Sequence, residues 1–271
     1  MFLEIIPLFS LVTSIFLLLG IYFYSIIISE TKNLIFLKSF FYDSSFILFF
    51  SFLNLILLLL NFFIIFFGVN PLLIKIISLF FIFSGVIGLK KIINKLYFLK
   101  FENKFIFVKL LLILFFLVAL FPITDPDSFD YHMTVPKLTL EENQLFIKDF
   151  WLQSNLFGLG EILIMLGQAG SSFNVSQLTQ FFSLVMISAL IINYKDQLID
   201  TKQRLLIITC ILIIPTNLFL IFSSKPQLYS ICSNFTALFL TLLILPKIEK
   251  EKQFLILFLL ISLLCLPSTQ F

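Results

Sequence analysis

The chain has 271 residues, of which 60% are hydrophobic and only 12% charged. A soluble domain carries roughly 25% charged residues, so this composition, with a mean hydropathy of +1.12, excludes an ordinary soluble domain. The formal net charge of +3 comes from lysines scattered between apolar blocks. Such a charge indicates no nucleic-acid partner, and the expected partner is a lipid bilayer.

Apolar runs of about 18 residues or more recur along the chain, and each is long enough to cross a hydrocarbon core of about 30 Å. The sequence therefore predicts an all-α, polytopic transmembrane bundle of about eight spanning helices. A short re-entrant or interfacial helix is expected in addition. We treat residues 1–271 as a single integral membrane domain, with N-terminal helices in 1–121, an acidic segment with juxtamembrane helices in 122–173, and C-terminal helices in 174–271. The chain stops directly after an apolar run, which is typical of a truncated reading frame.

The predicted helices alternate with short polar connections. The first three cover about 5–28, 44–67 and 72–89, with a tight turn at 68–71 between the second and third. A fourth covers about 105–121, and the later ones cover about 175–192, 205–222, 227–245 and 254–266.

Charge sets the expected orientation. The connection from Lys90 to Lys104 carries five lysines against one acid, Glu102, and the positive-inside rule therefore predicts that it is cytoplasmic. The next helix leads to Pro122–Asp149, which holds six of the 15 acidic residues and the only histidine. We expect this segment on the extracytoplasmic side of the cytoplasmic membrane.

The segment from Leu156 to Gly170 leaves two alternatives open. It is short, rich in glycine, and carries Glu161 within an apolar stretch. If it crossed the membrane, the later basic connections would lie outside. If it lies along the interface or re-enters, those connections lie inside, and this is the interpretation that we favour. An ionisable residue at membrane depth is costly and usually faces a cavity or a partner.

The acidic segment contains a helix start. Asp125 is followed by Pro126, and this pair is typical of an N-cap and a first helical residue. At 100° per residue, one face would carry Asp127, Asp130, Tyr131 and Thr134. His132 would point elsewhere, toward the membrane interface or a neighbouring helix. A break or restart is expected at Pro136.

Carboxylates on one helix face are what general-base catalysis or a divalent metal requires. Asp127 and Asp130 are the candidate pair, and Mg²⁺ or Mn²⁺ is the cofactor that such a pair could hold. The plainer interpretation is that first-turn acids only stabilise the helix end. Lys225, at a later helix junction, could meet a phosphate, although interfacial lysines often only extend their ammonium group toward water.

These residues resemble the GT-C-type integral membrane glycosyltransferases, and above all their uncharacterised bacterial relatives. The resemblance lies in Asp127-Ser-Phe-Asp-Tyr131-His132, in Pro136-Lys137 and in Leu159-Gly160-Glu161, and it covers about residues 121–245. More than one predicted helix precedes the motif here, whereas the family usually has one.

The resemblance implies transfer of a sugar, with inversion, from a polyprenyl-phosphate donor to an envelope acceptor outside the cytoplasmic membrane. It implies that Asp127 is the base or metal ligand and Asp130 the second carboxylate. The residues expected to bind substrate are Tyr131, His132, Lys137, Glu161 and Lys225. The alternative is a non-enzymatic protein, either a transporter or an envelope-assembly subunit, with polar groups along a path across the helices.

Overall fold

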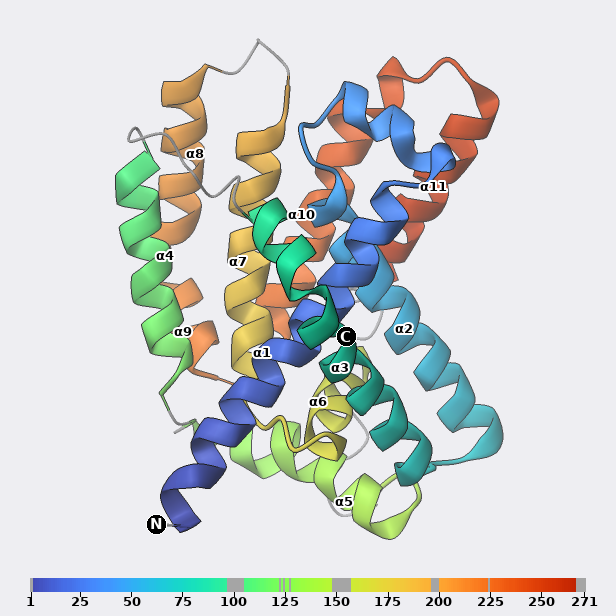
Figure 1. Cartoon of the computed structure of the whole chain (residues 1–271), viewed down its shortest axis with the longest axis vertical. Coiled ribbons are helices and arrows are strands. Elements are labelled where there is room, and N and C mark those ends of the chain that lie inside the picture. The colour runs from blue at the N-terminus through green and yellow to red at the C-terminus, as the bar shows by residue number, and fades with distance from the viewer. Residues whose placement is uncertain are drawn as a thin grey trace.

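The computed structural model describes residues 2–96, 105–121, 123, 125–126, 128–147, 157–195, 200–223 and 225–266 (Figure 1). Its helices are α1 (Phe2–Ser29), η1 (Lys32–Ser39), α2 (Ser45–Phe67), α3 (Pro71–Leu96), α4 (Ile106–Ala119), η4 (Ser128–Met133), α5 (Thr134–Glu142), α6 (Leu159–Ala169), α7 (Val175–Asn193), α8 (Thr201–Ile213), α9 (Pro215–Phe222), α10 (Gln227–Leu243), η6 (Leu245–Lys247) and α11 (Glu251–Cys265). Within these ranges the only β-type pairing is an isolated bridge between Phe41 and Tyr194. The predicted all-α class is confirmed.

Five of the described helices are long and apolar enough to cross a membrane: α1, α2, α3, α7 and α10. The pair α8 and α9 makes a sixth if it is one span bent by 54° at Ile214, the residue before Pro215. The residue before a proline avoids helical geometry, which explains the bend. By length, α4 with 14 residues and α11 with 15 fall short of a full span. The described helices therefore include five candidate spans, or six with the bent pair, and the predicted count of about eight is not confirmed.

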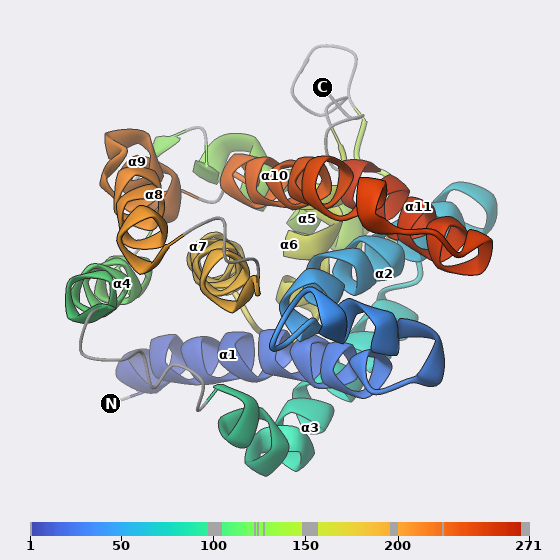
Figure 2. The same cartoon turned by 90° about the horizontal axis from the view of Figure 1, so that it is seen from above.

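Helix α7 lies in the middle of the bundle. Figure 2 shows it surrounded by α1, α4, α9 and α10, and 83% of its most apolar stretch is buried inside the protein. The close pairing of α1 with α3 depends on two glycines, because a side chain on Gly20 or Gly85 would clash with the backbone of the other helix. Small residues at such crossings let membrane helices approach closely.

One end of the bundle gathers basic residues, and we call it the basic end. It is formed by residues 30–44, 90–96, 193–195, 200–204 and 244–251 (the upper end in Figure 1). Lys91 pairs with Glu30 at 2.6 Å and Lys95 with Asp43 at 3.5 Å. The backbone of Tyr42 donates to Asn193 at 3.0 Å. The connection predicted over 90–104 is helical as far as Leu96, because α3 simply continues; residues 97–104 lie outside the described ranges.

The opposite end, which we call the acidic end, is formed by the described residues of 121–147, 157–174 and 222–227 (the lower end in Figure 1). The start of α1 is tied to it, since the backbone N–H of Phe173 donates to Ser10 at 2.8 Å. Gln177 in the first turn of α7 donates to the carbonyl of Phe121 at 2.9 Å. Helix α6 has 11 residues and nine of them are buried. It lies beside α5 at this end, as expected of a helix too short to cross.

Most of the described part of the acidic segment is helical. Residues 128–133 form a π-helical turn, η4, which leads directly into α5. Pro136 does not end the helical segment: the change from the π-helical turn to α5 comes at Thr134, and Pro136 lies in the first turn of α5. A π-helix turns by less than 100° per residue, so η4 changes which residues share a face of the helix. Phe129 is exposed, whereas His132 is buried against the neighbouring helix α6, one of the two directions expected for it.

Candidate functional site

Asp125 begins the helical part of the acidic segment, as its position before Pro126 predicts. Its carboxylate accepts from the backbone N–H of Ser128 at 3.1 Å and from the Ser128 hydroxyl at 2.7 Å. Partial burial alone would raise the pKa of the Asp125 carboxyl. The Ser128 hydrogen bonds and the Lys225 ammonium outweigh that effect and hold the pKa below its ordinary value of 3.8. Asp125 is therefore a carboxylate at neutral pH.

Lys225 reaches this carboxylate from the junction of α9 and α10. Its Nζ lies 3.4 Å from Asp125 Oδ2, and the two side chains are 16% and 17% exposed, respectively. The junction is fixed by Gln180 of α7, which donates to the Lys225 carbonyl and accepts from the backbone N–H of Tyr229 at 2.8 Å. The Lys225 N–H donates to the Ser223 hydroxyl at 3.3 Å. The lysine is thus held by groups of α7 and by its own turn.

His132 and Glu161 form a second polar pair at the acidic end. His132 Nδ1 lies 2.8 Å from Glu161 Oε1, and the two residues are 2% and 5% exposed. The other Glu161 oxygen accepts from the backbone N–H of Gly158 at 2.9 Å, which caps α6. Glu161 therefore both closes the first turn of α6 and holds the imidazole.

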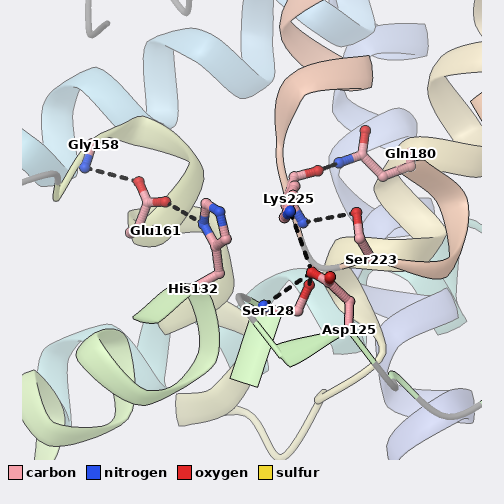
Figure 3. Close-up of polar contacts among 8 residues, drawn as sticks. All are labelled: Asp125, Ser128, His132, Gly158, Glu161, Gln180, Ser223 and Lys225. Carbon is pink, nitrogen blue, oxygen red and sulfur yellow. Dashed lines mark hydrogen bonds and ion pairs between the residues drawn. The ribbon is translucent and has the colours of Figure 1, made fainter. Parts of the chain in front are cut away.

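The two pairs come from different parts of the chain and lie on neighbouring elements around the start of α6 (Figure 3). A side chain on Gly160 would clash with the ring of Pro226, so α6 packs directly on the turn that carries Lys225. The far end of α6 is tied to η4, because Gln168 donates to the Met133 carbonyl at 2.9 Å. Figure 3 shows Ser128 and His132 on the segment that lies between the Glu161 and Lys225 sides.

The predicted site residues divide into three groups. His132, Glu161 and Lys225 lie at this site, with the Tyr131 ring 3.8 Å from the His132 ring, centre to centre. Asp130 is exposed on η4, and Lys137 forms an exposed pair with Glu141 at 3.8 Å, away from the buried groups. Asp127 lies outside the described residues.

The described residues alone do not assemble a metal centre. Nowhere among them do three His, Cys, Asp or Glu side chains converge as metal ligands. Sequence reasoning also missed three contributing residues: Ser128, which donates to the Asp125 carboxylate; Gly158, whose backbone N–H donates to Glu161; and Gln180, which contacts Lys225 45 positions away.

The arrangement offers two chemical capabilities. A partly exposed ammonium at a helix junction can bind a phosphate, provided that the phosphate replaces the Asp125 carboxylate. A histidine whose Nδ1 contacts a carboxylate has its orientation and tautomer fixed, so its other nitrogen can accept a proton. Both groups lie at the acidic end of the bundle.

The fold and the site define a polytopic helical membrane protein with a charged cluster at one end. The chain matches the DUF1420 N-terminal domain over residues 2–271, and it therefore belongs to that family. No curated protein and no solved structure matches the chain.

Asp125→Asn tests the electrostatic contribution of the Asp125 pair. Because the folded-state pKa lies below 3.8, the charge stabilises the fold fully above that pH and loses its effect as pH falls through the folded value. At pH 7 the variant should be less stable by about 1 kcal/mol. The difference from wild type, measured by thermal unfolding in detergent, should shrink below pH 3.8. A difference that stays constant down to the acid limit would contradict this role.

Proposed function

We propose that this chain is the membrane domain of a GT-C-like glycosyltransferase. In this proposal it transfers a sugar from a polyprenyl-phosphate donor to an envelope acceptor on the extracytoplasmic side of the cytoplasmic membrane. The observation that carries the proposal is the placement of the Asp125–Lys225 and His132–Glu161 pairs on neighbouring elements at the acidic end. A donor of this kind presents a phosphate and a sugar at the same membrane depth.

The distribution of ionisable groups favours this reading over a transporter. In the described ranges, every Asp, Glu, Lys, Arg and His lies between helices or within two turns of a helix end. The polar groups deeper in the bundle are neutral: Asn54 donates to Ser233 at 3.0 Å and accepts from Tyr229. A proton- or ion-coupled path would need ionisable groups along the way.

The proposal assigns Lys225 to the donor phosphate. Its ammonium is partly exposed, and its carboxylate partner can be exchanged for a phosphate oxygen without burying an unpaired charge. Asp127 and Asp130 remain the proposed carboxylates near the sugar, as the resemblance implies. The described residues alone do not form a site for a divalent cation, and the candidate ligand Asp127 lies outside them.

Orientation is part of the proposal. The basic end carries Lys38, Lys91, Lys95, Lys195, Lys202, Arg204, Lys247 and Lys250, and we place it in the cytoplasm by the positive-inside rule. With α6 confined to the acidic end, the chain returns to that end before α7. The proposed topology therefore has eight crossings, counting α4, the bent α8–α9 pair and α11.

Cysteine labelling tests this orientation. In a background without Cys210, Cys232 and Cys265, a cysteine at Asn143 should react with a membrane-impermeant maleimide from outside intact cells. A cysteine at Asn94, exposed on the last turns of α3, should react only after permeabilisation. The reverse pattern would place the charged cluster in the cytoplasm and remove the basis of the proposal.

Donor binding is tested by photo-cross-linking. A polyprenyl phosphate with a photoreactive group next to the phosphate should label peptides that contain residues 125–133, 157–161 or 225–229. Unlabelled polyprenyl phosphate should compete, whereas phosphatidylglycerol should not. Lys225→Gln should reduce the labelling, and Lys247→Gln, at the basic end, should not. Labelling spread evenly over lipid-facing helices, without competition, would contradict a donor site.

A further inference from the structure

His132 has an unused nitrogen. Its Nδ1 contacts Glu161, but Nε2 is buried and, among the described residues, finds no hydrogen-bond partner. A buried polar atom without a partner costs roughly 1–3 kcal/mol, so proteins keep such an atom mainly where it serves a purpose. The contact with Glu161 accounts for Nδ1 but gives no partner to Nε2.

The contacts of Glu161 indicate which nitrogen carries the proton. Glu161 Oε2 accepts from the Gly158 N–H at 2.9 Å, and Oε1 faces His132 Nδ1 at 2.8 Å. A carboxylate accepts at both oxygens, so Nδ1 is the donor in this pair. In a neutral imidazole Nε2 then bears the lone pair. The Glu161–His132 pair therefore presents a proton-accepting nitrogen and fixes its direction.

We propose that His132 is the proton acceptor of the transfer reaction, which rests on the function proposed above. The acceptor oxygen forms a bond to the anomeric carbon, and the bond from that carbon to the phosphate oxygen breaks. The electron pair of the broken bond leaves with polyprenyl phosphate. The proton of the acceptor hydroxyl moves to Nε2 and later passes to water. Glu161 is a positioning residue, because it acts only through the imidazole.

Binding of the donor controls whether the acceptor hydroxyl can reach His132 Nε2. The turn that carries His132 begins at Ser128, whose N–H and hydroxyl are both bonded to Asp125. Asp125 is in turn held by Lys225 at 3.4 Å. A donor phosphate that takes Lys225 releases Asp125 and with it the start of η4. The acceptor hydroxyl reaches Nε2 once the donor is in place, and this order protects the sugar from water.

The tautomer is measurable in the wild-type protein, because the chain contains one histidine. In protein labelled with ¹⁵N-histidine, the spectrum in detergent should show one protonated nitrogen assigned to Nδ1 and one unprotonated nitrogen assigned to Nε2. A proton on Nε2 in the neutral form would overturn the proposal. This measurement needs neither turnover nor a variant.

The single histidine also reports its own accessibility. Diethyl pyrocarbonate reacts with an unprotonated imidazole nitrogen, and the product absorbs at a characteristic ultraviolet wavelength. His132 should react slowly in the donor-free protein and faster after addition of polyprenyl phosphate. In Asp125→Asn it should react faster even without the lipid. An unchanged rate in both cases would contradict the release of η4.

Turnover of a polyprenyl-phosphate sugar by the full-length protein completes the test. His132→Gln should lower it by about 10²–10⁴-fold, the usual contribution of a general base, while the affinity for polyprenyl phosphate changes little. Gln168→Met is the matched control, because Gln168 makes another side-chain hydrogen bond from α6 to η4, outside the Glu161–His132 pair. It should stay within a few-fold of wild type. Equal losses in both variants, or full activity in His132→Gln, would overturn the assignment; an inactive wild type would instead refute the proposed function.

Discussion

Lys225→Gln is expected to weaken binding of a polyprenyl-phosphate donor by about 10- to 100-fold, because a hydrogen bond to a charged group contributes about 1.5–3 kcal/mol. The loss should appear in the KM for the donor rather than in kcat, since the same contact exists before and during transfer. Lys225→Arg keeps the charge and should retain most of the affinity. Binding can be measured with fluorescent polyprenyl phosphate in detergent.

Asp125→Asn provides the opposing control for this prediction. It removes the carboxylate that holds Lys225 at 3.4 Å, so the ammonium becomes available to the donor phosphate. Donor affinity in Asp125→Asn should therefore be equal to or higher than in wild type. If Asp125→Asn and Lys225→Gln weaken binding equally, the pair only holds the turn in place and Lys225 does not bind phosphate.

Asp127→Asn is expected to lower transfer by about 10²-fold or more, because a carboxylate beside an oxocarbenium-like transition state stabilises its positive charge. Asparagine preserves the size and much of the hydrogen bonding but carries no charge. Asp130→Asn should cost less, since Asp130 is exposed. Asp149→Asn should cost almost nothing. The assay is sugar transfer by correctly inserted, full-length protein, with insertion verified by protease protection.

The effects of Asp127→Asn distinguish the role of Asp127 from that of His132. If His132 is the proton acceptor, Asp127→Asn retains the response of His132 to diethyl pyrocarbonate. Full activity in Asp127→Asn would show that this residue is only a first-turn acid, stabilised by the helix dipole. The likeness to GT-C enzymes would then lose its central residue.

The helical blocks could be predicted from the sequence because their apolar runs are long and their boundaries are marked. The α2–α3 turn is one example: Gly68 has a positive φ of 79° and Pro71 starts the next helix. The cap at Asp125 is another, since it depends on residues only three positions apart. Local chemistry determines such features, so a local pattern reveals them.

The π turn and the two ion pairs could not be predicted in the same way. Periodicity at 100° per residue assumes an α-helix, and η4 violates that assumption between Ser128 and Met133. The His132–Glu161 contact joins residues 29 positions apart, and Lys225 meets Asp125 only because α7 fixes the α9–α10 junction through Gln180. These contacts depend on tertiary packing, for which a single sequence carries no direct signal.

Hydropathy alone could not fix the number of spans either. Hydropathy identifies apolar runs, but α4 and α11 end after 14 and 15 residues, and α8 and α9 meet at a bend. A run of apolar residues predicts burial in lipid or in protein and does not by itself fix a straight helix of full length.

The most direct measurement is release of polyprenyl phosphate from a radiolabelled polyprenyl-phosphate hexose by the purified full-length protein in proteoliposomes, with a cell-envelope extract added as the source of the acceptor. The product is separated from the donor by thin-layer chromatography. Our account predicts that wild-type protein consumes the donor and that Lys225→Gln, Asp127→Asn and His132→Gln each slow the reaction, while Lys247→Gln does not. A correctly folded wild-type protein that neither binds nor consumes any such donor would contradict the account.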